Sequence, residues 1–256
     1  MIDLCCHILP GLDGSAPYLD AAARMAEIAV DSGCDVLVTA PISADCSDSM
    51  YRVCEGKKLS DSYMTLSSEI QARNIPLQLR SGMLIHASDT SKVLQGLQKG
   101  NLYPLEGTRY LMLELSGSHE PDTDDTEGTF DRILGMTQKL CQAGYKPIFA
   151  KPEFMDLFIQ NPDRCEDIIA EGGFFLGSKS GLLGRVNPET QDALMYMISQ
   201  GYIAAIASFA VHHEFDTPHM EETLSMIQTA FSDDAAALLM DINPNRFLHD
   251  DVPLQY

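Results

Sequence analysis

The chain begins with MIDLCCHILPGLDGS, residues 1–15, and this stretch decides the fold. An apolar run leads to His7, Leu9-Pro10-Gly11 turns the chain, and Asp13 follows. Many barrel enzymes begin a metal site in this way, with a buried strand that brings a histidine and an aspartate to its carboxyl end. Such a site would need a His-x-His pair, but residue 5 is Cys5. We therefore expect the framework of such a site here without its full set of metal ligands.

Apolar runs of strand length alternate with helical stretches along the rest of the chain. The predicted strands are residues 2–9, 36–40, 77–85, 109–115, 147–150, 173–178 and 202–208. Asn161-Pro162 and Asn187-Pro188 each predict a helix start, with the asparagine as N-cap and the proline in the first turn. Residues 42–59 show no clear period and predict a loop. Strand–helix alternation predicts a parallel sheet, doubly wound or closed into a barrel, in one domain over residues 1–256.

Charge, apolar run lengths and cysteine content indicate which partners and which compartment to expect. Of the 256 residues, 17 are Lys or Arg and 37 are Asp or Glu, which gives a formal net charge of −20. A surface this acidic repels nucleic acid and anionic membranes, so we expect neither as a partner. We also expect no membrane insertion, because no apolar run approaches the ~20 residues that a span requires. Seven cysteines without a CxxC pair, and no signal peptide, predict a reduced, cytoplasmic protein.

The carboxyl ends of the strands are where chemistry is expected in folds of this type. Those ends carry His7 and Asp13; Pro41 and Ile42; Leu84 and His86; Glu114; Lys151 and Glu153; Lys179; and Phe209 and Val211. A hydrolytic metal site needs several imidazoles and carboxylates that converge on one point. We identify only His7, Asp13, Glu114 and Glu153 as suitable, and Lys151 would compete with a metal for the carboxylates.

Seven segments follow one another in the order of a known family. The chain reads Asp3-Leu4-Cys5-Cys6-His7-Ile8-Leu9-Pro10-Gly11-Leu12-Asp13-Gly14 where the family pattern is D-x-H-C-H-x-L-P-x-x-D-D-G. The other matching segments are residues 39–43, 81–85, 150–154, 178–185 and 207–212, and the pair Asn243-Pro244. Together they resemble the PHP-superfamily protein-tyrosine phosphatases of bacterial capsule and exopolysaccharide clusters, the CpsB/YwqE type. The resemblance covers nearly the whole chain.

The resemblance implies a distorted (β/α)7 barrel, PHP-like and related to the TIM barrel. In active members it implies manganese-type ions that activate water against a phosphotyrosine. The departures fall on ligand-type positions, which here are Cys5, Ile42, Leu84, Lys151, Phe209 and Val211. Two family arginines are also missing, at Phe154 and just before Pro218. We therefore expect no cofactor, no bound metal and no catalytic residue. What remains is a vestigial barrel-mouth site of His7, Asp13, Glu114, Lys151, Glu153 and Arg185.

Each of these residues also has a purely structural interpretation. His7 suits a hydrogen-bonded histidine of the barrel mouth better than a lone ligand. Asp13 is equally well explained as a turn residue after Pro10-Gly11. Cys5 and Cys6 point to opposite faces of a strand and are interpreted as buried structural residues.

The cationic residues and the last histidines leave alternatives open. We hypothesise that the Lys151 ammonium lies between Asp13 and Glu153 and replaces a lost cation; the alternative is a lysine that reaches solvent. Arg185 either holds an anion near the mouth or forms a surface salt bridge. The group His212, His213, Glu214 and His219 is interpreted as a solvated polar loop, with a displaced metal site as the alternative.

Three functions are compatible with this sequence. The first is an inactive phosphatase homologue kept as a binding or regulatory module, with a partner such as a tyrosine-kinase tail suggested by family analogy alone. The second is a metal-dependent phosphotyrosine phosphatase with a rearranged site built from His7, Asp13, Glu153 and the His212/His213 loop. The third, a metal-free enzyme that uses Lys151 or a cysteine, ranks last because no nucleophile–base pair is visible. An oligomer is compatible with each of them.

Overall fold

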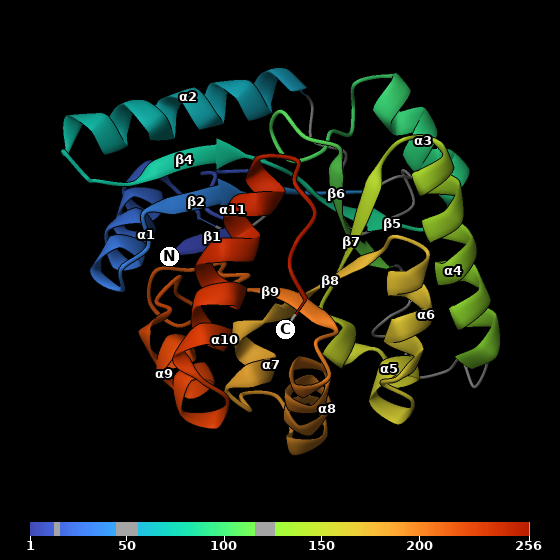
Figure 1. Cartoon of the computed structure of the whole chain (residues 1–256). Coiled ribbons are helices and arrows are strands. Elements are labelled where there is room, and N and C mark those ends of the chain that lie inside the picture. Colours follow the sequence, from blue (N-terminus) through green and yellow to red (C-terminus); the bar gives the residue numbers. More distant parts are fainter. Residues whose placement is uncertain (13–15, 45–55, 116–125, 256) are drawn as a thin grey trace.

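Parallel strands lie in the middle of the computed structural model and helices surround them (Figure 1). The structure describes residues 1–12, 16–44, 56–115 and 126–255. Within these residues the strands form two parallel sheets, ordered β1-β2-β4 and β3-β5-β6-β7-β8-β9. The strands are β1 (Ile2–Cys6), β2 (Val36–Thr39), β3 (Ile42–Ala44), β4 (Gln78–Ser81), β5 (Leu84–Ala87), β6 (Tyr110–Leu115), β7 (Lys146–Ala150), β8 (Phe174–Ser178) and β9 (Ile203–Ala207).

Helices follow most of the strands and cover their outer faces (Figure 1). They are α1 (Leu19–Asp31), α2 (Gly56–Ala72), α3 (Thr90–Gln98), α4 (Thr126–Gln142), α5 (Asp156–Gln160), α6 (Arg164–Ala170), α7 (Lys179–Leu182), α8 (Pro188–Ser199), α9 (Glu221–Ala230), α10 (Asp233–Ala237) and α11 (Asn243–Leu248). A 3₁₀ turn, η1 (Pro152–Phe154), precedes α5, and a π-helical turn, η2 (Leu238–Ile242), joins α10 to α11. No helix in the described ranges is long and apolar enough to cross a membrane.

The first and last strands lie side by side. The Phe209 N–H donates to the Cys5 carbonyl at 2.8 Å, and the His7 N–H donates to the Ala210 carbonyl at 2.9 Å. The predicted α/β fold of the distorted (β/α)7 type is thus confirmed in its parallel strands and surrounding helices. Over the described residues, however, the strands form two sheets and not one closed ladder.

The break between the sheets corrects two sequence-based expectations. Residues 77–85 were expected to form one strand, but β4 and β5 are separated at Gly82, where a Cβ would lie 2.7 Å from Val38 Cγ1. Pro41 has no N–H to donate, and it separates β2 from β3. The expected loop over 42–59 therefore contains β3 and the start of α2; residues 45–55 of it lie outside the described part of the chain.

The two Asn-Pro pairs behave differently. Asn187 caps α8 as predicted, since its Oδ1 accepts the Thr190 N–H at 2.7 Å and Pro188 begins the helix. Asn161 was expected to cap a helix in the same way, and this was wrong. It follows α5, and its carbonyl accepts the Arg164 N–H at 3.1 Å in a turn before α6. An Asn-Pro pair suits such a turn as well as a helix start.

Side chains point alternately to the two faces of each strand and pack in two separate apolar clusters. In β6, Tyr110 and Met112 pack in the cluster inside the ring of strands, whereas Leu111 and Leu113 pack under the helices. This period of two places Glu114 on the inner face, at the carboxyl end of the strand. The interior is therefore apolar along its length and acidic at this end, where the candidate site lies.

Candidate functional site at the carboxyl ends of the strands

The mouth of the ring of strands holds an ion pair. Lys151 follows β7, and its Nζ lies 2.9 Å from Oε1 of Glu114 on the neighbouring β6. His86 is the register partner of Glu114 on β5, with its Nδ1 3.9 Å from Glu114 Oε2. The Glu114 side chain is 6 % exposed and that of Lys151 is 22 % exposed. A carboxylate and a cation thus meet at a largely buried position.

The backbone and one aromatic ring fix the lysine. Lys151 has a left-handed φ of 56°, and its N–H donates to the Leu176 carbonyl at 2.8 Å. Its Nζ also lies 4.8 Å from the centroid of the Phe209 ring, a cation–π contact. Burial lowers the pKa of Lys151, but the charge and hydrogen bond of Glu114 outweigh that effect and the net shift is upward. The ammonium therefore stays charged where it touches Glu114.

The predicted partners of Lys151 need correction. We expected the ammonium between Asp13 and Glu153, but its hydrogen bond goes to Glu114. Sequence reasoning did not find this partner because it did not fix which neighbouring strand the side chain reaches. Asp13 lies outside the described residues. Glu153 is near enough to Lys151 to feel its charge, and its own hydrogen bonds go elsewhere.

Glu153 is fully buried beside β8. Its Oε1 accepts the Ser178 N–H at 2.9 Å and the Ser178 hydroxyl at 2.5 Å. Its Oε2 has no hydrogen-bond partner among the described residues. Burial raises the pKa of Glu153 to about 7, against the opposing effect of the Ser178 hydroxyl. This carboxyl therefore exchanges its proton near neutral pH.

Two buried charged groups were missed as site residues. Asp3 on β1 accepts the Ser208 hydroxyl at 2.5 Å and the Ser208 N–H at 3.0 Å, and burial raises its pKa. Lys179 at the start of α7 is 1 % exposed, donates to the Thr217 carbonyl, and has its pKa lowered by burial. The signal was present for both, because a charged residue within or directly after an apolar run is a buried charge that needs a partner.

The structural interpretations of the first strand agree with the structure. His7 is buried, and its Nδ1 lies 2.6 Å from the Ala40 carbonyl. Cys5 and Cys6 are fully buried, and burial raises the pKa of the Cys6 thiol well above its usual range. These thiols are therefore packing residues, as expected.

The remaining candidates lie outside the buried mouth. Arg185 pairs with Glu222 at 2.6 Å, and both side chains are exposed, which is the surface salt bridge that the sequence left open. His212, His213 and Glu214 follow β9, and their ligand-type atoms lie within 4.8 Å of one another. The His213 Nδ1 is buried without a hydrogen-bond partner in the described part of the chain.

A metal cluster at the mouth does not fit the residues present. Lys151 hydrogen-bonds Glu114, and the Phe209 ring lies against the ammonium, so a cation and an apolar ring stand beside the carboxylate where metal ligands would be needed. Over the described ranges, His212, His213 and Glu214 are the one group of three or more metal-binding side chains close enough to hold an ion. These three residues are adjacent in sequence and lie in the loop after β9.

Known proteins resemble this chain over nearly its full length. A family model described as "Capsular polysaccharide synthesis, CpsB/CapC" matches residues 1–249. The tyrosine-protein phosphatase YwqE of Bacillus subtilis is 23% identical over 241 residues, which are 94% of this chain and 89% of YwqE. A crystal structure from work on YwqE and on CpsB from Streptococcus pneumoniae, "unique metal-dependent tyrosine phosphatases", superposes with a TM-score of 0.84 and 23% identity, covering 100% of this chain and 97% of that one.

A more distant structure shares the fold. Histidinol phosphate phosphatase from Lactococcus lactis, solved with zinc, histidinol and phosphate, is 10% identical with a TM-score of 0.60, over 90% of this chain and 95% of that one. The comparison with YwqE and CpsB corrects one expectation. We predicted no cofactor, but these relatives are described as metal-dependent, and the His212–Glu214 group offers ligands in this chain. The absence of a cofactor is therefore not supported.

Proposed function

Because this chain belongs to the CpsB/CapC family of capsular polysaccharide synthesis, we propose that it is a member in which partner binding has replaced phosphoester hydrolysis. The observation that carries this proposal is the 2.9 Å contact between Lys151 and Glu114 at the mouth. The lysine supplies a fixed cation where the family resemblance places metal ligands. A lysine cation balances the carboxylate but does not generate a hydroxide, whereas a divalent ion lowers the pKa of bound water.

The surroundings of the lysine support the same proposal. Leu84 and Phe209 donate no lone pair, and Phe209 packs against the ammonium. Arg185, which the sequence offered as a residue that could hold an anion, pairs instead with Glu222 on the exposed surface. Among the described residues, hydrolysis of a phosphotyrosine would thus find neither an activated water nor a cationic clamp.

Partner binding would use the exposed side of the mouth. Phe215, in the loop after β9, is 75% exposed, and its ring stacks on His212 with centroids 3.9 Å apart. Such an aromatic pair suits an aromatic side chain of a protein partner, and a tyrosine-rich kinase tail is the partner suggested by family analogy. We also place the protein in the cytoplasm; the free cysteines Cys5, Cys6, Cys34, Cys141 and Cys165 support this.

A second candidate function rests on the loop after β9. His212, His213 and Glu214 could hold one divalent ion, and a phosphatase with a rearranged metal site would use it. Two imidazoles and a carboxylate are a common donor set for zinc and manganese. The two candidates differ in whether the purified protein hydrolyses phosphotyrosine when a metal is supplied.

Hydrolysis of a phosphotyrosine peptide, with and without added Mn²⁺, separates the two candidates. YwqE serves as the positive control, and bound metal is measured by elemental analysis after dialysis. We expect no turnover above buffer under either condition, whether or not an ion is bound. Metal-dependent turnover that His213→Asn abolishes, and that the matched change His219→Asn leaves intact, would establish the second candidate instead.

Partner binding is tested with a fluorescently labelled tyrosine-rich peptide. We expect Phe215→Ser to weaken its binding about tenfold, because the change removes the exposed ring. Met64→Ser is the matched control, since Met64 is 63% exposed but lies on α2. Equal affinity in the two variants, or no binding by the unmodified protein, would count against the mouth as the binding surface.

A further inference from the structure

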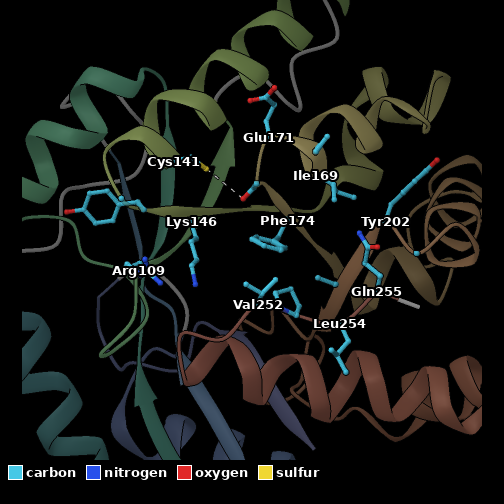
Figure 2. A pocket seen from close by; sticks show the side chains of 17 residues that line it. Arg109, Cys141, Lys146, Ile169, Glu171, Phe174, Tyr202, Val252, Leu254 and Gln255 are labelled. Carbon is cyan, nitrogen blue, oxygen red and sulfur yellow. Dashed lines mark hydrogen bonds between the residues drawn. The ribbon is translucent and has the colours of Figure 1, made fainter.

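A second concave region lies at the opposite end of the strands from the mouth. It has a volume of about 770 Å³ and is lined by residues at the amino ends of β6, β7, β8 and β9, the end of α6, and the last described residues of the chain. Figure 2 shows its walls, with Phe174 and Val252 in the middle. Neither the family resemblance nor the proposed function uses this cavity.

Hydrogen bonds hold in place the wall that the last described residues form. Asn243 is fully buried, and its Nδ2 donates to the Leu254 carbonyl at 2.9 Å. The Leu254 N–H donates back to Asn243 Oδ1 at 2.7 Å. The Arg246 guanidinium also holds the Val252 carbonyl. The cavity is therefore preformed, and a ligand would pay little to order its walls.

The interior is apolar and the charge is concentrated on one side. Figure 2 shows Arg109 and Lys146 together at one side of the cavity, and Tyr202 and Gln255 at the other. Glu171 lies at the rim, away from the two cations in this view. This arrangement matches the usual design of small-molecule sites, in which an apolar wall is combined with a few polar groups.

The two cations share one carboxylate. Arg109 Nε lies 2.7 Å from Asp250 Oδ2, and Lys146 Nζ lies 3.4 Å from Asp250 Oδ1. Lys146 also donates to the Asp250 carbonyl at 2.8 Å. On this side of the cavity the two cations face one carboxylate, whereas Glu171, an acidic residue of the lining, lies away from them (Figure 2). Arg109 is 56% exposed and so can reorient toward a ligand.

We propose that this cavity binds a small amphipathic anion, with its apolar body against Phe174 and Val252 and its anionic head beside Arg109 and Lys146. The volume lies in the range of about 300–1,000 Å³ that is typical of such sites. The proposal is independent of the chemistry at the mouth, since the two regions lie at opposite ends of the strands. A medium-chain carboxylate has the chemistry that the cavity would recognise.

Decanoate is the probe, below its micellar concentration, and decanol and decyltrimethylammonium are compared with it. Binding is followed by calorimetry and by the rate at which iodoacetamide modifies Cys141, a partly exposed thiol in the wall of the cavity. We expect decanoate to slow that modification and to bind about tenfold more tightly than decanol, with the cation weakest. Equal binding of the three compounds, or no protection of Cys141, would overturn the proposal.

A blocking variant locates the site without disturbing the core. Ala170 is exposed at the rim, at the end of α6, and Ala170→Trp would fill the entrance. Ala72→Trp, at the exposed end of α2, is the matched control. We expect at least about tenfold weaker decanoate binding in the first variant and unchanged binding in the second. Undiminished binding in Ala170→Trp, with the variant folded by circular dichroism, would refute this location.

Discussion

Three buried acidic residues are held by two kinds of partner. Glu114 has a lysine, whereas Glu153 and Asp3 each have a serine. A cation keeps a buried carboxylate charged, while a hydroxyl donor only partly offsets the cost of its burial. Each acid therefore depends on its own partner, and removal of one partner should destabilise only the acid that it contacts.

Lys151→Met tests the balance at Glu114. Methionine keeps most of the apolar stem but leaves the Glu114 carboxylate buried without its cation. We expect the free energy of unfolding to fall by about 2–3 kcal/mol, below the usual loss for a fully buried pair because Lys151 is partly exposed. Urea denaturation followed by circular dichroism measures the change.

The double variant Lys151→Met/Glu114→Gln is the control for that prediction. It removes both charges, so most of the lost stability should return. If the double variant loses as much free energy of unfolding as Lys151→Met and Glu114→Gln lose together, the contact between the two side chains does not stabilise the fold.

Glu153→Gln tests the pH dependence of the fold. Burial raises the pKa of Glu153 from 4.5 to about 7, so the folded protein holds this proton more tightly than the unfolded chain. This contribution to stability is complete below pH 4.5 and is lost as the pH rises through about 7. The unmodified protein should therefore lose up to about 3 kcal/mol relative to Glu153→Gln between pH 5 and pH 8. Parallel stability curves for the two proteins would contradict this.

The sequence predicted the buried environment of the site residues, but it did not predict which carboxylate pairs with Lys151. The burial of Cys5 and the hydrogen bond of His7 follow from their places on, and directly after, an apolar strand. Lys151 was expected to meet a carboxylate, and it does, but the partner is Glu114. The choice depends on the register of β6 and β7 and on the left-handed backbone at Lys151, which the sequence did not reveal.

At the scale of elements, the alternation of strands and helices was predictable and the interruptions were not. The hydrophobic runs identified the regions of β6, β7, β8 and β9, because strands buried on both faces read as continuous apolar segments. The division into two sheets was missed; it falls at Gly82, where a Cβ would lie 2.7 Å from Val38 Cγ1, and at Pro41, which has no N–H to donate.

The capped start of α8 gives a prediction at this scale. Asn187→Ala removes the acceptor for the Thr190 N–H and should cost about 1 kcal/mol of stability, whereas Asn187→Asp should cost only a few tenths. Asn161→Ala is the matched control, because Asn161 precedes a proline too but caps no helix. Urea denaturation of the three variants measures the order, and an equal loss in the two alanine variants would contradict the assignment.

At the scale of the whole molecule, the last residues of the chain lie across the amino ends of the strands (Figure 1). Tyr110 donates its hydroxyl to the Asp251 carbonyl at 2.7 Å, and Lys146 donates to the Asp250 carbonyl at 2.8 Å. Asn243 adds its two hydrogen bonds to Leu254. Most of these contacts go to the backbone of the end segment, so its position depends on a few anchoring side chains more than on its own sequence.

Asn243→Ala tests that anchoring. The change removes the bonds to Leu254 and leaves the Ala204 carbonyl without its donor. We expect a loss of about 2–3 kcal/mol and faster hydrogen exchange at the Leu254 amide. Asn245→Ala, an exposed position in the same helix, is the control and should change neither quantity. Unchanged exchange at Leu254 in Asn243→Ala would show that other contacts hold the segment.

The contact between β1 and β9 has a consequence for how the protein is made. Ser208, the hydroxyl partner of Asp3, is 205 residues further along the chain, so the ribosome has produced most of the polypeptide before the first strand meets its last neighbour. Until then the nascent chain carries an open edge and an unsatisfied acid. We therefore expect a translation product that stops short of β9 to be cleaved by proteases more readily than a chain that includes β9.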